Sequence, residues 1–165
     1  MERLRIAMLD DEKGALKNLT NILEQFIENV EIVASFNDPE VALEKIKQLN
    51  IDVLFLDINM PKLNGFDFLQ KLDLIDFQIV FITAFEKYAI RAFKSNAVDY
   101  LLKPINVNTL RETIENVRKL KTAQNVNVNL ESKSIYHRSL LNLFNPSVEN
   151  KYQDKISVKT TEGTY

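Results

Sequence analysis

The amino-acid sequence predicts an α/β fold: a doubly wound parallel sheet of five strands with five helices. Three observations predict it. Short apolar runs of strand length alternate with segments of helical spacing along residues 3–121. Residues 53–56 form a continuous apolar run, which is typical of a strand covered on both faces. Alternation of strands and helices favours parallel strands joined by right-handed crossovers.

Residues 3–36 predict a strand, a helix and a second strand. The stretch 3–9 is polar at its start and then apolar, as expected of the first strand. Apolar residues recur at helical spacing over 15–27 and would cover one face of the sheet. Residues 31–36 are the second strand. A second helix should begin at Asp38-Pro39, because Asp can cap free amides and Pro suits the first helical position.

The central strand is expected at 51–57, so it ends on Asp57. In open α/β sheets ligands bind outside the carboxyl ends of the strands, and Asp57 would lie at that edge. A third helix is expected from Phe66, after three residues typical of turns: Pro61, Asn64 and Gly65.

The second half of the fold follows the same alternation. Residues 78–82 predict a fourth buried strand and 97–102 a fifth. A fourth helix is expected at 88–93 between them. A last helix should run over 107–121, where apolar residues recur at steps of three and four, with Asn106 as its cap.

Composition excludes several classes of protein. The chain of 165 residues is 45% hydrophobic and 27% charged, which is ordinary for a soluble globular protein. A net charge of -2 gives no sign of a nucleic-acid surface. No apolar run approaches a membrane span, so we expect no membrane partner. The absence of Cys suits a cytoplasmic location, and the single His137 excludes a histidine-rich metal site.

The pattern weakens after the last predicted helix. Residues 122–154 are Asn-rich and predict a linker that could be partly helical. Residues 155–160 then alternate like a strand, and Glu162-Gly163 is typical of a hairpin turn. A hairpin without its second strand is not stable alone, so we expect 155–165 to be the start of a further domain.

Four of the five predicted strands end on polar residues. In a parallel sheet these ends share one edge, so the side chains can converge there. Crowded carboxylates repel unless a positive charge neutralises them, and Mg²⁺ prefers oxygen ligands of this kind. The residues are Asp10 and Asp11 after the first strand, Asp57 after the third, Thr83 after the fourth and Lys103 after the fifth.

Each of these residue types has a chemical use in phosphoryl transfer. The Asp57 carboxylate can attack a phosphoryl group and form an acyl phosphate. Mg²⁺ and the Lys103 ammonium would stabilise the charge on the transferring oxygens, and the Thr83 hydroxyl can donate to one of them. Because the Lys103-Pro104 bond can be cis, it would aim the lysine inward. Taken singly, each residue could instead be a solvated acid, a helix cap or a surface lysine.

At these positions the sequence closely resembles the receiver domain of bacterial two-component response regulators. The resemblance covers about residues 1–121 and implies the flavodoxin-like strand order 2-1-3-4-5. The matching residues are Asp10-Asp11, Asp57 with Met60-Pro61 and Gly65, Thr83-Ala84, Tyr100 and Lys103-Pro104.

The resemblance implies a role for each residue of the site. Asp57 would accept a phosphoryl group from the phosphohistidine of a sensor histidine kinase. Mg²⁺ would be bound by Asp11, by Asp57 and by the backbone carbonyl of Asn59, with Asp10 acting through water. The phosphoryl oxygens would be held by Lys103, the Thr83 hydroxyl and the Ala84 amide.

Thr83 and Tyr100 would form the switch pair. Thr83 would move towards the phosphoryl group and vacate space into which Tyr100 turns. The surface of the fourth helix, fifth strand and fifth helix would change, and a homodimer would form on phosphorylation.

A finer resemblance links the chain to LytTR-type regulators, which carry a C-terminal DNA-binding domain built from strands. It rests on residues 83–93 and 96–105, and residues 155–165 resemble the opening strand and turn of that domain. The expected organisation is a receiver at 1–121, a linker at 122–154 and a truncated effector at 155–165. DNA would then be bound only through the missing C-terminal domain.

The leading interpretation is a signalling switch, with no enzymatic activity beyond its own phosphotransfer and dephosphorylation. Two other classes of protein compete with it. A haloacid-dehalogenase-like phosphatase also uses Asp and Mg²⁺, but it carries an Asp-x-Asp motif after the first strand, where this chain has Asp10-Asp11-Glu12. A phosphate-independent dimerisation module would not need the intact acceptor, lysine and threonine.

Overall fold

The computed structural model describes residues 2–85 and 98–126. Its centre is a five-stranded parallel sheet in the order β2-β1-β3-β4-β5, which confirms the predicted fold class and strand order. The strands are β1 (Leu4–Leu9), β2 (Val30–Phe36), β3 (Val53–Asp57), β4 (Gln78–Thr83) and β5 (Val98–Leu102).

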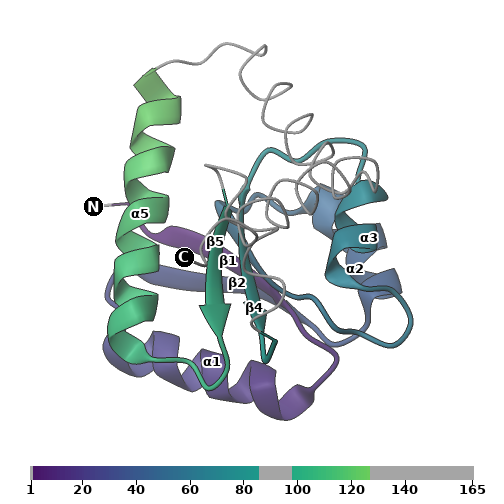
Figure 1. Ribbon diagram of the computed structural model, residues 1–165. Coiled ribbons are helices and arrows are strands. Elements are labelled where there is room, and N and C mark those ends of the chain that lie inside the picture. Colours follow the sequence, from purple (N-terminus) through teal and green to yellow (C-terminus); the bar gives the residue numbers. More distant parts are fainter. Residues whose placement is uncertain (1, 86–97, 127–165) are drawn as a thin grey trace, which may run out of the picture.

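Helices cover both faces of the sheet (Figure 1). α1 and α5 pack on one face and α2 and α3 on the other. Their bounds are α1 (Lys13–Phe26), α2 (Pro39–Lys45) continued by the 3-10 turn η1 (Ile46–Gln48), α3 (Gly65–Gln70) and α5 (Val107–Val126). None of the helices in the described ranges has the length and hydropathy that a membrane span requires.

Some predicted elements lie outside the described residues. They are the fourth helix at 88–93, the linker beyond residue 126 and the effector start at 155–165. α5 is longer than predicted, because it continues to Val126 through the first residues of the expected linker. Near its end, Lys121 Nζ lies 3.0 Å from Asp52 Oδ1, which precedes β3, so this part of the helix is held against the sheet.

β3 is the centre of the hydrophobic core, since all five of its residues are buried. Val53 and Phe55 face the core under α1 and α5, and Leu54 and Leu56 face the core under α2 and α3. This two-sided burial explains the continuous apolar run in the sequence. It also carries Asp57, only 4% exposed, to the carboxyl edge of the sheet.

Side-chain caps fix where three helices begin. The Asp38 carboxylate accepts from the amide of Glu40, and Asn106 Oδ1 accepts from the amides of Asn108 and Thr109, as predicted. α3 begins at Gly65, one residue before the predicted start, because Asn64 caps it.

We expect Asn64→Ala to lower the free energy of unfolding by about 1 kcal/mol. Asn64 Oδ1 accepts from the amide of Asp67 at 2.9 Å, and Asn64 Nδ2 donates to Asp67 Oδ2 at 2.7 Å. Urea unfolding measures the effect. Gln70→Ala, at an exposed position of the same helix, should change the value by less than about 0.5 kcal/mol, and an equal loss in both variants would contradict the cap.

Candidate functional site

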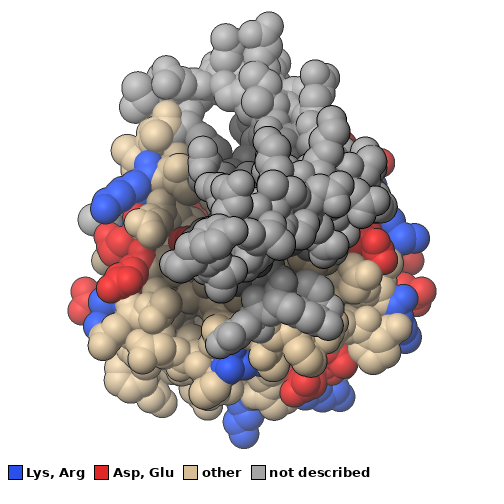
Figure 2. Space-filling view, viewed as in Figure 1, with Lys and Arg blue, Asp and Glu red and all other residues tan. Residues whose placement is uncertain are grey.

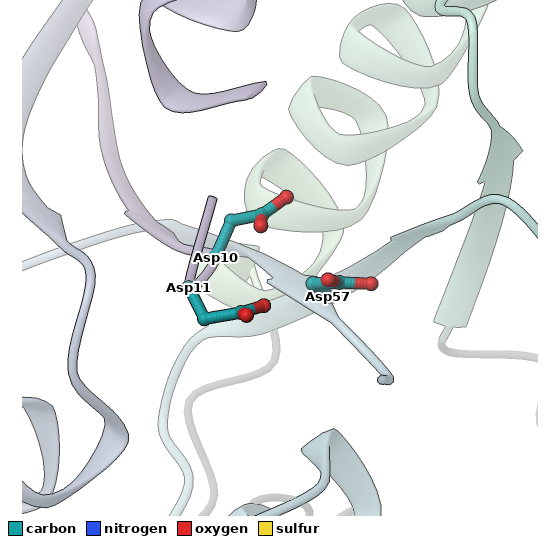
Figure 3. Close-up of side chains that lie close together, drawn as sticks. All are labelled: Asp10, Asp11 and Asp57. Carbon is teal, nitrogen blue, oxygen red and sulfur yellow. The ribbon is translucent and has the colours of Figure 1, made fainter. Parts of the chain in front are cut away.

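Three carboxylates meet at the carboxyl edge of the sheet. Asp10 and Asp11 follow β1, and Asp57 is the last residue of β3, the neighbour of β1. One oxygen from each carboxylate lies within 4.8 Å of the other two. Figure 3 shows Asp10 and Asp11 extending from the same turn towards Asp57. The predicted convergence of these acids is therefore present in the structure.

Lys103 supplies the positive charge of the site. Its Nζ lies 2.7 Å from Asp10 Oδ2 and 3.6 Å from Asp57 Oδ2. The backbone amide of Lys103 donates to the carbonyl of Thr83 at 2.9 Å, which fixes the lysine beside the end of β4. The Lys103–Pro104 peptide bond is cis. The closer ion pair of Lys103 is the one with Asp10, and no sequence pattern predicted that Asp10 would be nearer than Asp57.

Within residues 2–85 and 98–126, two buried oxygens of the site have no hydrogen-bond partner. They are Asp11 Oδ1 and Thr83 Oγ1, and the Thr83 side chain is fully buried. Buried polar atoms are usually paired, so unpaired ones call for a ligand or another explanation. The Asp11 oxygen can coordinate a cation, and the Thr83 hydroxyl can donate a hydrogen bond to an anion. With three carboxylate oxygens in reach of one another, this donor set fits a hard cation such as Mg²⁺.

The electrostatics of the site raise the pKa of Asp57 to about 6, from a usual value near 3.8. Burial is the main cause and the negative charge of Asp10 the second, while Lys103 and the backbone amide of Asn59 act in the opposite direction. Burial would lower the pKa of Lys103, yet its hydrogen bond to Asp10 and the charge of Asp57 raise it. Lys103 is therefore charged at neutral pH. The described site then has one ammonium group against three carboxyl groups.

We expect the metal-free protein to lose stability as the pH rises from about 4 to above 6 because of Asp57. The folded state binds the Asp57 proton more tightly than the unfolded state does, so ionisation of this group favours unfolding. Urea unfolding of the protein and of Asp57→Asn in a chelator, at pH 4.5 to 8, isolates the contribution. The variant should gain stability relative to the natural chain over this range, and a constant difference would contradict the assignment.

The other predicted site residues lie around this centre. Asn59 and Ala84 are exposed, two residues after Asp57 and one after Thr83. The half-buried Tyr100 packs against the α2–α3 side of the core, and its hydroxyl donates to the backbone carbonyl of Phe85. No side-chain pattern could have predicted this acceptor, because it belongs to the main chain.

Gly65, which the sequence predicted as a turn residue, lies next to the backbone of Asp57. Its amide donates to the carbonyl of Ile58 at 2.8 Å. A Cβ at this position would lie 2.5 Å from the backbone oxygen of Asp57. The described glycines have no positive φ, so Gly65 is needed for this close approach and not for a left-handed turn.

Comparison with known proteins identifies the arrangement. The family model of the response regulator receiver domain matches residues 6–115. The chain belongs to this family. Receiver domains are the phosphoacceptor modules of two-component response regulators. This membership disfavours the haloacid-dehalogenase-like alternative.

Similar proteins include other response regulators. An uncharacterised response regulatory protein of Vibrio vulnificus is 33% identical over 161 residues, covering 92% of this chain and 66% of its own length. The transcriptional regulatory protein BtsR of Salmonella typhi is 40% identical over 126 residues, covering 76% of this chain and 52% of its own. The chain thus spans between about half and two thirds of these receiver proteins.

Solved receiver structures share the fold. The response regulatory domain of protein mrkE from Klebsiella pneumoniae is 32% identical with a TM-score of 0.61, covering 74% of this chain and 98% of that domain. The isolated receiver domain of RcsB from Salmonella enterica, solved with a phosphomimetic, has a TM-score of 0.62 at 22% identity, so it supports the fold alone.

Proposed function

We propose that Asp57 is the phosphoacceptor of this receiver. The observation that carries the proposal is the position of its carboxylate: buried at the end of β3, 3.6 Å from the Lys103 ammonium and within reach of Asp10 and Asp11. A carboxylate nucleophile needs a nearby positive charge to receive a phosphoryl group, and Lys103 supplies one. The unpaired Thr83 hydroxyl is a further donor at the adjacent strand end, and the Ala84 amide follows it.

Mg²⁺ is the metal that this donor set would hold. Asp11, with its unpaired buried oxygen, and Asp57 would bind it, the carbonyl of Asn59 would be a third ligand, and Asp10 would act through water. When bound, Mg²⁺ would supply positive charge to a site in which carboxylates outnumber the lysine. Lys103 would then exchange its present pairing with Asp10 for a phosphoryl oxygen.

The contact of Tyr100 supports its proposed role in the switch. The tyrosine hydroxyl is bonded to the carbonyl of Phe85, two residues after Thr83 on the same connection. A movement of Thr83 towards a phosphoryl group would therefore shift the acceptor of Tyr100. Moving such a switch from mostly inactive to mostly active requires roughly 5.5 kcal/mol of differential binding. Charge-assisted contacts of the phosphoryl group with Lys103 and Thr83 would contribute to it.

The proposed partners are a sensor histidine kinase, which supplies the phosphoryl group, and a second copy of the chain. The output would be a LytTR-type effector that binds DNA. Two comparisons support an output beyond the receiver: the Vibrio vulnificus match covers 92% of the chain, more than residues 6–115, and BtsR is a transcriptional regulatory protein. A phosphate-independent dimerisation module is the competing function.

Sedimentation with and without beryllofluoride and Mg²⁺ separates these two functions. We expect a monomer without the mimic and a dimer with it, because the added negative charge would draw Thr83 inward and change the β5–α5 surface. Thr83→Ala should weaken the response, since it removes the donor. A dimer that forms equally without beryllofluoride would favour the phosphate-independent module.

A further inference from the structure

Asn64 and Gly65 form the only Asn-Gly pair in the sequence. This dipeptide is prone to deamidation, because glycine has no side chain to shield its amide nitrogen from the neighbouring Asn side chain. The pair lies between β3 and α3, where Asn64 is partly exposed and Gly65 is buried against the backbone of Asp57. The proposed phosphotransfer makes no use of this reactivity.

Deamidation begins by closing a five-membered ring between the two residues. The Gly65 nitrogen gives up its proton to solvent and attacks Asn64 Cγ, where a new N–C bond forms. The bond from Cγ to Nδ2 breaks, and Nδ2 takes a proton from solvent and leaves as ammonia. Water then opens the ring at either of its carbonyls, which gives aspartate or isoaspartate. In total one water is consumed and one ammonia released, without an oxidant or reductant.

Four hydrogen bonds hold the pair in the closed turn. The Gly65 amide, which would be the nucleophile, donates to the carbonyl of Ile58 at 2.8 Å. The Asn64 carbonyl accepts from the amide of Phe68 at 2.9 Å. The Asn64 side chain is held at both ends by Asp67, since Oδ1 accepts from its amide at 2.9 Å and Nδ2 donates to Oδ2 at 2.7 Å.

The main-chain dihedral of Asn64 shows that these bonds oppose ring closure. Its ψ is 162°, an extended value. In the ring, the Gly65 nitrogen lies nearly in one plane with Cα, Cβ and Cγ of Asn64, so the peptide unit between the two residues must rotate. That rotation would carry the Gly65 amide away from Ile58 and the Asn64 carbonyl away from Phe68. Reacting atoms need a separation of about 3–3.5 Å in an aligned geometry, and the closed turn prevents it.

We propose that Asn64 is a deamidation site that reacts only when the β3–α3 turn opens, and that its isoaspartyl product prevents the turn from closing again. In isoaspartate the main chain runs through the former side chain and is one carbon longer. Gly65 has no room to absorb the extra length, because it already lies against the Asp57 carbonyl. The aspartyl product keeps the main chain but replaces the donor to Asp67 by a carboxylate oxygen, so it disturbs the turn less.

The first test follows deamidation of the natural chain in mildly alkaline buffer, with and without guanidinium chloride. Digestion and mass spectrometry locate the modified residue, and an isoaspartyl methyltransferase detects isoaspartate. We expect Asn64 to be the first Asn to react in the denaturant. In buffer alone it should react about tenfold more slowly or less, because an ordered turn opens rarely. Equal rates in the two conditions would overturn the proposal, and so would another Asn that reacts first in the denaturant.

Asp67→Ala is the deciding variant. It removes the acceptor of Asn64 Nδ2 and keeps the main-chain amide that donates to Oδ1. The turn should open more often, so deamidation in buffer should accelerate about threefold or more, as expected for one lost hydrogen bond. Asp76→Ala makes the same change at an exposed position outside α3 and should react at the natural rate. An unchanged rate in Asp67→Ala would overturn the proposal.

Val117→Ala separates opening of the turn from unfolding of the whole chain. Val117 is buried in the core under α1 and α5, on the other face of the sheet from α3, so this variant lowers the overall stability and leaves the turn intact. Its deamidation in buffer should keep the natural rate, and an acceleration that matches the lost stability would overturn the proposed protection by the turn.

The last measurement concerns the product. The isoaspartyl form, separated by ion-exchange chromatography, should unfold at a lower urea concentration than Asn64→Asp, which represents the other product. Equal stability of the two would contradict the claim that isoaspartate prevents closure. None of these outcomes depends on Asp57 being the phosphoacceptor.

Discussion

Asp57→Asn should abolish phosphorylation of the protein by a small phosphodonor. An amide oxygen is a far weaker nucleophile than a carboxylate. We expect neither neighbouring aspartate to replace Asp57. Both oxygens of Asp10 already accept hydrogen bonds, from Lys103 and from the backbone amide of Glu12, and Asp11 follows β1 instead of β3. Intact mass after incubation with phosphoramidate and Mg²⁺ measures the result. The natural chain should gain one phosphoryl group, and the variant none.

Asp76→Asn is the matched control for this prediction. Asp76 is exposed in the connection before β4, away from the carboxyl edge of the sheet. The control should be phosphorylated at the natural rate. A phosphoryl group that still appears on Asp57→Asn would show that another residue is the acceptor, and it would contradict the proposed function.

The convergence of the site could be predicted because it follows from the positions of strand ends. In this chain the apolar runs located each strand to within one or two residues at either end. Parallel strands then end at one edge of the sheet. The end of β3 was placed correctly at Asp57, and β4 exceeded its prediction only by Thr83. Residues as distant in sequence as Asp10 and Lys103 are therefore brought into contact by topology alone.

Other features of the site depend on atomic distances that no pattern encodes. Lys103 Nζ lies about one ångström closer to the Asp10 carboxylate than to the Asp57 carboxylate, and this small difference decides which of them is its nearer partner. The acceptor of Tyr100 is a main-chain carbonyl, which every residue type provides. The surface gave no further guide: acidic and basic side chains mingle on the described part of the face in Figure 2.

β3 links the core to the chemistry, since the strand that fills both halves of the core also ends on the proposed nucleophile. The turn after it must then return close to the strand. Gly65 makes this possible because it has no Cβ, which would lie 2.5 Å from the backbone oxygen of Asp57, and its amide donates to the carbonyl of Ile58. The lack of a side chain at residue 65 is thus a requirement of the site as well as of the fold.

Gly65→Ala should lower the free energy of unfolding by about 3 kcal/mol, because its Cβ would lie 2.5 Å from the Asp57 carbonyl oxygen and neither backbone segment can yield cheaply. The displaced turn should also slow phosphorylation by on the order of tenfold or more, since small errors in placement are costly in catalysis. Urea unfolding and labelling by phosphoramidate measure the two effects.

Gly14→Ala provides a control of opposite sign. Gly14 lies in the first turn of α1, and a Cβ there would have no heavy atom within 4 Å. Alanine restricts the unfolded chain and favours the helix, so this variant should gain about 0.5–1 kcal/mol. The same chemical change would then stabilise one position and destabilise the other, and the difference would measure the close approach of the turn to β3. Similar losses in both variants would mean that contact with Asp57 is not what makes residue 65 a glycine.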